Sequence, residues 1–385
     1  MALSDDLTPP QSIKEKMGKL VDLLERSGID PDDIGKVEKI NVWQGFLKDG
    51  NGEPQLVDMA GVVLSPEWAL PPEYPVVQPA APTIVKPVRH QGRNTDAIVS
   101  VILPDPQIGY RRMPDGEMIA CHDEVAMDVA LQIAKSVKPN RIVNLGDFID
   151  LPEWSSKFLV LPEFVLTTQP AIDRSHLFLA QQRAIAGEDA EIILLGGNHD
   201  DRLTKAVAKN AMAALRLRRA NVPDEFPVLS IPYLLRLGEL GVKYLGGYPA
   251  DSYKIAEGGA GQTPFYAIHG FKLDVAKVAR SERQSYIQGH IHRIAYHSET
   301  YEINRRPETV IGMSCGCLCR IDGVVPSTKG GVDDMGRPIT RYESWQQGMS
   351  IVTELEDGTY AIETVAIHNG VAMFRGRVFK AGNIE

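Results

Sequence analysis

Residues 141–150 read RIVNLGDFID, a short apolar run followed at once by a glycine and two carboxylates. The same order recurs along the chain, because AIVSVIL precedes Asp105, EIILL precedes Asn198, PFYAI precedes His269 and SYIQ precedes His290. Apolar runs of this length indicate buried strands, so we predict strands at 97–103, 141–145, 191–195, 264–268 and 285–288. Each of these strands is followed by a loop with oxygen or imidazole groups, which is how a fold gathers the ligands of a metal site.

Five short motifs occupy these loops, and their order along the chain is informative. They are Asp105-Pro106-Gln107, Gly146-Asp147-Phe148-Ile149-Asp150, Gly197-Asn198-His199-Asp200, His269-Gly270 and Gly289-His290-Ile291-His292. Any one of them is common, whereas all five in this order resemble the calcineurin-like metallophosphoesterases, also called binuclear metallophosphatases. The resemblance covers roughly residues 97–315. It implies a hydrolase of phosphate esters that uses two divalent metal ions.

Further periodic segments surround the five strands. Helical spacing of apolar residues predicts helices at 123–137 and 174–186, and apolar runs predict strands at 242–245, 308–313, 349–355 and 360–367. Buried strands interleaved with helices indicate an α/β domain with helices on the outside. The family resemblance implies the more specific arrangement of an αββα sandwich.

The N-terminal part of the chain has a different character. We predict a helix at 12–26 and two strands at 37–47 and 55–64 joined by a turn at 49–52, which together make a small α+β accessory module over residues 1–69. Residues 70–95 are proline-rich and predict an extended linker. The metallophosphoesterase domain then spans residues 96–385. The module could bind DNA, form a homo-oligomer or dock a partner protein.

Composition and charge narrow the class of protein. The chain has 385 residues and a net charge of −9, which is not the charge of a protein that coats nucleic acid. No apolar stretch is long enough to cross a bilayer and the N-terminus lacks a signal pattern, so we expect a cytoplasmic protein with no membrane partner. Four cysteines do not suggest a disulfide framework. Cys315, Cys317 and Cys319 alternate, and on a single strand they would face one side. We expect buried strand cysteines rather than a structural metal site, which usually needs four ligands and loop-like C-x-x-C spacing.

The resemblance implies a role for each metal ligand. Asp147 would bridge two divalent cations, with Asp105, Gln107 and His292 on one of them. Asn198, His269 and His290 would bind the other. Oxygen and imidazole ligands suit Mn, Fe, Zn or Ni better than Ca, and Mn is our first expectation, with Mg as a further alternative. Gln107 departs from the family, where histidine is commoner, and a neutral amide oxygen should hold its cation less tightly.

Three further residues are candidates for catalysis. By the resemblance, His199 would donate a proton to the leaving oxygen. Asp200 would orient His199, and Asp150 would tie down a neighbouring loop or histidine. Arg202 could face the substrate, although a structural salt bridge is at least as good an interpretation.

The expected substrate is a phosphodiester, either nucleic acid or a nucleotide. The protein phosphatase branch has Arg-Gly after its second motif and Glu after Gly-Asn-His, whereas this chain has Leu151-Pro152 and Asp200. The motifs fit the diesterase and nuclease branches better, including SbcD-like DNA nucleases. A predicted basic helix at 201–220 could follow a phosphate backbone or could be an ordinary solvated face.

Other interpretations remain open at this point. Gln107, the string at 197–202 and residues 342–348 resemble phosphoesterases of bacteriophages, in which case the protein would work in the host cytoplasm. A phosphomonoesterase or a nucleotide-diphosphate hydrolase is the second enzyme hypothesis. A catalytically silent scaffold of the same fold is the third, but only one ligand position deviates from the family.

Overall fold

The computed structural model divides the chain into two units, Met1–Thr83 and Ile84–Glu385. It describes residues 37–48, 52–64, 97–113, 115–156, 162–221, 225–303, 305–326 and 342–382, together with positions 18, 21, 22 and 26. In the first unit β1 (Val37–Lys48) pairs antiparallel with β2 (Pro54–Leu64), as predicted. The predicted linker at 70–95 and most of the helix at 12–26 lie outside the described residues, so the domain boundaries remain predictions.

A six-stranded sheet forms the centre of the second unit. Its order is β15 (Tyr360–Ile367), β14 (Gln347–Glu354), β3 (Ile98–Leu103), β6 (Arg141–Asn144), β7 (Glu191–Leu195) and β8 (Val242–Leu245). The strands from β3 to β8 are parallel, whereas β14 and β15 are antiparallel additions at one edge. All six were predicted to within about two residues at each end. The apolar runs of β3, β6, β7 and β14 are largely buried, whereas β8 and β15 are partly exposed.

A five-stranded sheet holds the later motifs. Its order is β12 (Ile294–Ile303), β13 (Arg306–Cys315), β11 (Ser285–Gln288), β10 (Phe265–Ile268) and β9 (Ser252–Ala256). Strands β10, β11 and β13 are parallel to one another. The sequence did not predict β9 or β12, because both lie at sheet edges where polar residues interrupt the apolar pattern.

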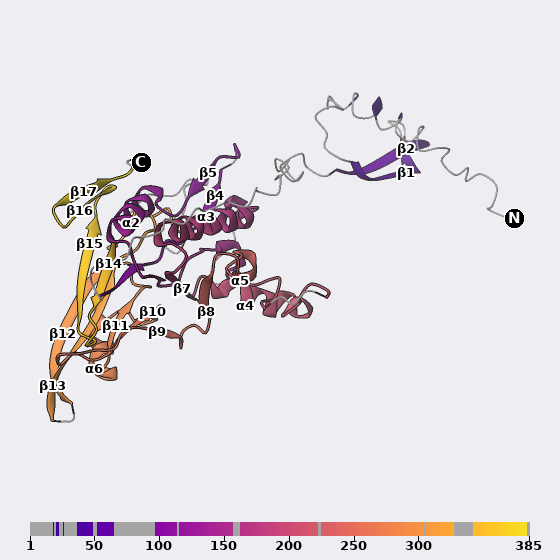
Figure 1. Cartoon of the computed structure of the whole chain (residues 1–385). Helices are drawn as coiled ribbons and strands as arrows, with labels where there is room; N and C mark the ends of the chain where they lie inside the picture. The colour runs from indigo at the N-terminus through magenta and orange to yellow at the C-terminus, as the bar shows by residue number, and fades with distance from the viewer. Residues whose placement is uncertain are drawn as a thin grey trace. The chain divides into compact units, whose positions relative to one another are not determined.

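Alternation along β3 explains how the two sheets pack. Val101 and Leu103 face α2 (Glu124–Val137) and α3 (Thr168–Ala186), whereas Ile102 faces the other way, into a core shared with the five-stranded sheet. On the outer side of that second sheet lies α6 (Val275–Glu282). Figure 1 shows α2 and α3 together on one side of this unit and α6 beside β12 and β13. The second unit is therefore a mixed α/β structure with two packed sheets.

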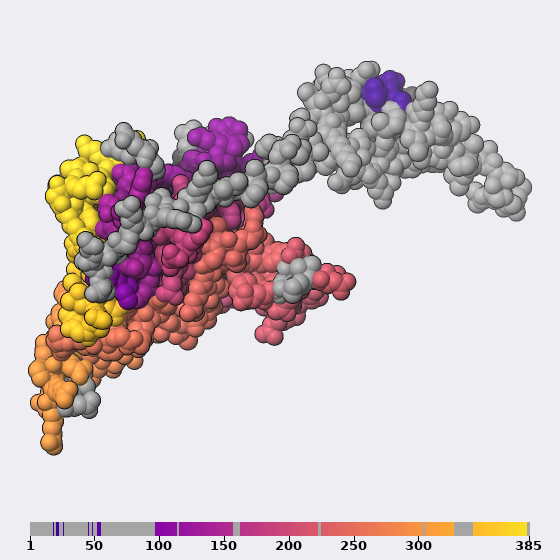
Figure 2. Space-filling model, in the orientation of Figure 1, coloured from indigo at the N-terminus to yellow at the C-terminus, as the bar shows by residue number. Residues whose placement is uncertain are grey.

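The segment after β7 departs from its prediction. The expected helix at 201–220 is wrong beyond residue 210, because α4 (Asp201–Asn210) ends there and only a 3-10 turn, η5 (Met212–Ala214), follows. Arg216 adopts a positive φ of 66°, which a continuous helix cannot contain. In the space-filling view this pink segment projects from the body of the second unit (Figure 2).

The remaining elements are short and lie between the larger ones. They are β4 (Tyr110–Arg112), β5 (Met118–Ala120), η3 (Pro152–Trp154), η4 (Pro162–Phe164), α5 (Ile231–Leu234), β16 (Val371–Phe374) and β17 (Arg377–Lys380). None of the helices in the described ranges is both long and apolar enough to cross a membrane.

Candidate metal centre

The candidate site lies where the parallel strands of both sheets end. Asp105, Asp147 and Asn198 follow the adjacent strands β3, β6 and β7, and His269 and His290 follow β10 and β11. The carboxyl ends of neighbouring parallel strands meet at one edge of a sheet, so both sheets deliver their polar loops to a common edge. The backbone N–H of His290 donates to Asp105 Oδ1 at 2.9 Å and thereby ties the loop of one sheet to the loop of the other.

Four side chains form one ligand group around Asn198. Its Oδ1 lies 3.1 Å from His269 Nε2 and 2.8 Å from His290 Nδ1. His269 Nε2 also lies 3.3 Å from Asp147 Oδ1. Asn198 and His290 are partly exposed, whereas Asp147 and His269 are buried. This group therefore forms the side of the site that solvent reaches.

The other ligand group is entirely buried and contains unpaired oxygen atoms. His292 Nε2 lies 3.6 Å from Asp105 Oδ1 and 3.4 Å from the amide nitrogen of Gln107. Asp105 Oδ2 and Gln107 Oε1 have no hydrogen-bond partner, although both are buried. Buried polar oxygens are normally satisfied because leaving them unpaired costs about 1–3 kcal/mol. Two unsatisfied buried acceptors beside an imidazole are ligands that suit a cation.

Asp147 connects the two groups. It belongs both to a potential cation-binding set with His269 and His290 and to one with Asp105 and His292. Burial would raise the pKa of Asp147, but the His199 and His269 rings hold that pKa well below its usual range. Burial would lower the pKa of His269, but Asp147 and Asp105 raise it to about 9. The buried carboxylates of Asp105 and Asp147 therefore concentrate negative charge, which either a proton or a metal cation can neutralise.

The backbone at these ligands is strained. Five of the seven proposed ligands have positive φ values, namely Asp105 (32°), Gln107 (44°), Asp147 (44°), His290 (69°) and His292 (54°). Left-handed backbone is uncommon outside glycine and costs of order 1 kcal/mol or more at each residue. Such outliers persist only where the surrounding structure holds them, and their concentration here marks a site shaped for binding.

Two motif glycines are explained by close approach to these carboxylates. A Cβ at Gly197 would lie 2.2 Å from Asp147 Oδ1, and a Cβ at Gly289 would lie 2.6 Å from Asp105 Oδ2. No side chain fits at either position. The glycines of the third and fifth motifs therefore make room for the ligands of the first and second.

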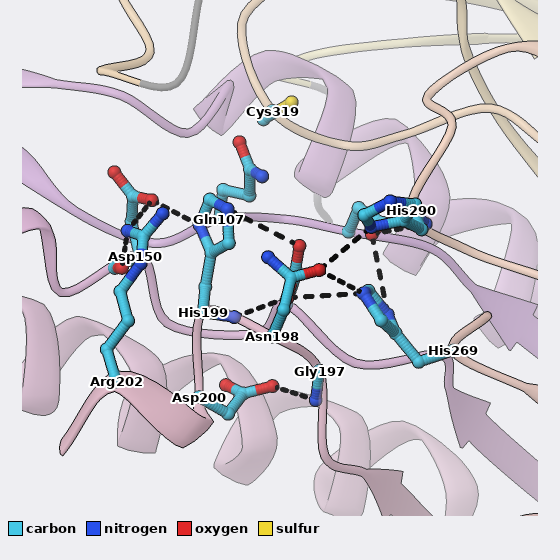
Figure 3. A network of polar contacts seen from close by, with 12 residues as sticks. Gln107, Asp150, Gly197, Asn198, His199, Asp200, Arg202, His269, His290 and Cys319 are labelled. Atoms are coloured by element: carbon cyan, nitrogen blue, oxygen red, sulfur yellow. Dashed lines mark hydrogen bonds and ion pairs between the residues drawn. The ribbon is translucent and has the colours of Figure 1, made fainter. Parts of the chain in front are cut away.

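His199 forms a buried chain of polar contacts with Asp150 and Arg202 (Figure 3). His199 Nδ1 lies 2.5 Å from Asp150 Oδ1, and Arg202 Nη1 donates to the same oxygen at 3.0 Å. Arg202 thus forms a structural ion pair, as the alternative interpretation of the sequence held. The opposite ring nitrogen of His199, Nε2, lies 3.6 Å from Asp147 Oδ2, which leaves it on the side of the proposed cations.

Asp200 has a different position from the one expected. Its carboxylate does not contact the His199 ring and instead accepts the backbone N–H groups of Gly197, Phe148 and Ile149 at 2.7–3.2 Å. Burial and the neighbouring Asp147 raise the pKa of Asp200 to about 6, against the lowering effect of these hydrogen bonds. The expectation that Asp200 orients His199 is therefore corrected. Asp150 contacts the ring, and Asp200 joins the second and third motif loops.

Removing Asp150 should destabilise the fold. Asp150→Ala removes a buried carboxylate that pairs with Arg202 and contacts the His199 ring, so we expect a loss of about 3 kcal/mol in the free energy of unfolding. Urea denaturation measures this. The matched control is Asp201→Ala, since Asp201 pairs with Lys205 at the surface and should contribute less than about 1 kcal/mol. Equal stability of the two variants would show that the buried ion pair is unimportant.

Two aromatic residues and two cysteines, Cys317 and Cys319, also lie at the site, although the sequence did not single them out as part of it. Trp345 packs edge-on against His292 with ring centroids 4.2 Å apart, and Tyr248 packs against His269 at 5.5 Å. The prediction of one strand carrying three cysteines is wrong, because β13 ends at Cys315. Gly316 then turns the chain with a φ of 96°, and Cys317 and Cys319 continue toward His292.

The chain matches no protein-family model and no curated protein. The fold and the site therefore define its class on their own. It is a mixed α/β protein in which buried histidine and aspartate groups could hold metal ions.

Proposed function

We propose that the chain is a calcineurin-like metallophosphoesterase that hydrolyses phosphodiesters with two divalent cations. The layers support the αββα sandwich of that family, since α2 and α3 cover one sheet and α6 covers the other. The single observation that carries the proposal is the position of Asp147, which is common to two cation-binding groups. Only an anionic bridge offsets the repulsion between two neighbouring dications.

The residues supply oxygen and imidazole ligands that suit divalent cations. When bound, two divalent cations polarise the phosphate and supply an activated water as the nucleophile. The chain itself orients the carboxylates. The backbone N–H of His199 donates to Asp147 Oδ1 at 2.8 Å, and the backbone N–H of His290 donates to Asp105 Oδ1 at 2.9 Å. Mn is the cation we expect first, and Fe, Zn, Ni or Mg would also accept this mixture of oxygen and nitrogen ligands.

His199 is proposed as the acid that protonates the leaving oxygen. Its Nδ1 contacts Asp150, which fixes the ring and leaves Nε2 directed toward the cation side of the site. Asp150 is in turn held by Arg202. Because Asp150 already fixes the ring in the folded protein, no further rotational freedom is lost when Nε2 presents a proton during the reaction.

A panel of metals and substrates tests the proposal. Purified protein with Mn, Mg, Zn or Ni is offered bis-p-nitrophenyl phosphate, p-nitrophenyl phosphate, cyclic nucleotides, DNA and RNA. We expect metal-dependent hydrolysis, with diesters preferred over monoesters. Preference for the monoester would favour a phosphomonoesterase. A complete lack of hydrolysis with both cations bound would favour the scaffold hypothesis.

Gln107→His should strengthen binding of the cation in the buried group. Imidazole is a better ligand than an amide oxygen for late transition metals, and the side chain already faces His292. We expect about a tenfold lower apparent Kd for Zn or Ni and longer survival of activity in a chelator. Unchanged or weaker affinity would place Gln107 outside the ligand set or indicate a pocket shaped for the amide.

Exposed arginines after α4 support a polynucleotide substrate. Arg216, Arg218 and Arg219 are all exposed, on the segment that follows His199 and α4. Because the helix ends at residue 210, these arginines do not form one stripe along a helix. They still place several positively charged side chains on a projecting surface. A phosphate backbone leaving the site would find such charges favourable.

Charge reversal separates this surface from the chemistry. Arg216→Glu, Arg218→Glu and Arg219→Glu together should weaken cleavage of single-stranded DNA by at least about tenfold and flatten its salt dependence. Hydrolysis of bis-p-nitrophenyl phosphate should stay within about twofold, since that small diester reaches only the metal centre.

The control carries the same change in charge on another surface. Lys138→Glu, Arg377→Glu and Lys380→Glu alter exposed residues at the end of α2 and on β17. This variant should cleave DNA at close to the wild-type rate. Equal losses in the two variants would assign the effect to net charge, and no loss in either would make a small nucleotide the better candidate substrate.

A further inference from the structure

Two thiols and an imidazole lie close together beside the proposed phosphoesterase site. Cys317 and Cys319 are fully buried and pack with Cys121, Val324 and Val325 in a small cluster. All four cysteines of the chain are free thiols. One ligand atom from each of His292, Cys317 and Cys319 lies within 4.8 Å of the other two.

The His292 ring stands between two sets of ligand atoms. Its Nε2 faces the Asp105 carboxylate at 3.6 Å, whereas its Nδ1 lies 4.0 Å from Cys319 Sγ. A histidine that binds a metal through one nitrogen normally donates the other N–H to a carboxylate, carbonyl or water. Here the neighbour of the second nitrogen is a thiol, which is itself a metal ligand.

We propose that His292, Cys317 and Cys319 form a further site for a thiophilic cation such as Zn²⁺ or Cd²⁺. Two thiolates and one neutral imidazole balance the charge of a divalent cation, and sulfur ligands select soft metals over Mn or Mg. Each thiol releases its proton to solvent as the metal–sulfur bond forms. The set leaves a fourth position open for water.

The three ligand atoms lie within 4.8 Å of one another and must draw closer together to hold one cation. Bonds of about 2.3 Å to sulfur and about 2.0 Å to nitrogen put tetrahedral ligand atoms roughly 3.5–3.8 Å apart. The observed contact of 4.0 Å between His292 and Cys319 must therefore shorten by about half an ångström.

The new site shares His292 with the proposed phosphoesterase site, and this part of the inference rests on the proposed function. A soft cation that draws His292 toward the thiols leaves Asp105, Asp147 and Gln107 to hold the buried cation. Gln107 contributes only a neutral amide oxygen. Binding of the soft cation should therefore release one Mn²⁺ ion from the pair.

Titration of the full chain with Cd²⁺ tests the site independently of hydrolysis. Cadmium–thiolate bonds give an ultraviolet charge-transfer band, and we expect it to saturate at about one Cd²⁺ per chain in the wild type. Cys317→Ser with Cys319→Ser should abolish the band. Cys315→Ser is the matched control and should retain it, because Cys315 is equally buried but packs in the core between the sheets.

Several outcomes would overturn the proposal. The band could be absent from the wild type, or it could persist unchanged in the double serine variant. His292→Ala provides a further variant that keeps both thiols, and an undiminished Cd²⁺ affinity there would remove the histidine from the site. Circular dichroism of each variant distinguishes loss of the site from loss of the fold.

Competition with Mn²⁺ tests the shared histidine. In equilibrium dialysis, one equivalent of Cd²⁺ should lower bound Mn²⁺ from about two to about one per wild-type chain and leave the double serine variant unaffected. A full complement of Mn²⁺ beside a saturated thiolate band would refute the sharing of His292. Failure to bind any Mn²⁺ would count against the proposed phosphoesterase, while the thiolate band would still decide the new site.

Discussion

Asp147→Asn is expected to abolish paired cation binding and phosphodiester hydrolysis together. The asparagine amide has nearly the same shape as the carboxylate, but it carries no charge to offset two dications. We expect a fall in rate of about three orders of magnitude or more, which corresponds to about 4 kcal/mol of lost transition-state stabilisation. Equilibrium dialysis with Mn²⁺ and hydrolysis of bis-p-nitrophenyl phosphate measure the two effects.

Asp201→Asn is the control for this substitution. Asp201 lies close in sequence to the third motif, but its carboxylate pairs with Lys205 at the surface. It should keep both the cations and the rate. If Asp147→Asn bound two cations per chain with wild-type affinity, Asp147 could not be the bridge.

His199→Ala is expected to slow turnover by about a hundredfold or more while leaving both cations bound. The backbone N–H of residue 199, which holds Asp147 Oδ1 at 2.8 Å, is retained in the variant. The loss should be larger for a dinucleotide than for bis-p-nitrophenyl phosphate, because a nitrophenolate leaves without protonation. Rates on the two substrates at saturating Mn²⁺ give the comparison.

The control is His297→Ala, which removes an imidazole from β12 that contacts Glu299. It should leave the rates on both substrates unchanged. A His199→Ala variant with the full rate on the dinucleotide would exclude His199 as the acid, and loss of cations from it would assign the residue to metal binding.

The parts of the fold that the sequence predicts are those where one physical signal dominates. The strands β3, β6, β7 and β11 are largely buried and β10 is buried or half-buried throughout, so their apolar runs stand out, and the motif after each one follows directly. Because these strands are parallel within each sheet, the structure brings all seven proposed ligands to one edge. That convergence depends on strand order, which no local pattern specifies.

Other features depend on contacts that are distant in sequence. Arg202 was ambiguous between substrate and salt bridge until the structure placed it against Asp150, which is 52 residues away. Asp200 was assigned to His199 because the two are adjacent, but its partners are mostly backbone groups of the second motif. The alternation of Cys315, Cys317 and Cys319 suggested one strand, and only the positive φ of Gly316 reveals that the chain turns between them.

The stoichiometry of cation binding tests the central claim most directly. Wild-type protein is stripped with a chelator, reconstituted with Mn²⁺, and followed by equilibrium dialysis and by hydrolysis of bis-p-nitrophenyl phosphate in parallel. We predict about two Mn²⁺ per chain at saturation, with activity appearing only as the second ion binds. Saturation at one ion or fewer with hydrolysis intact would contradict the two-cation site built around Asp147.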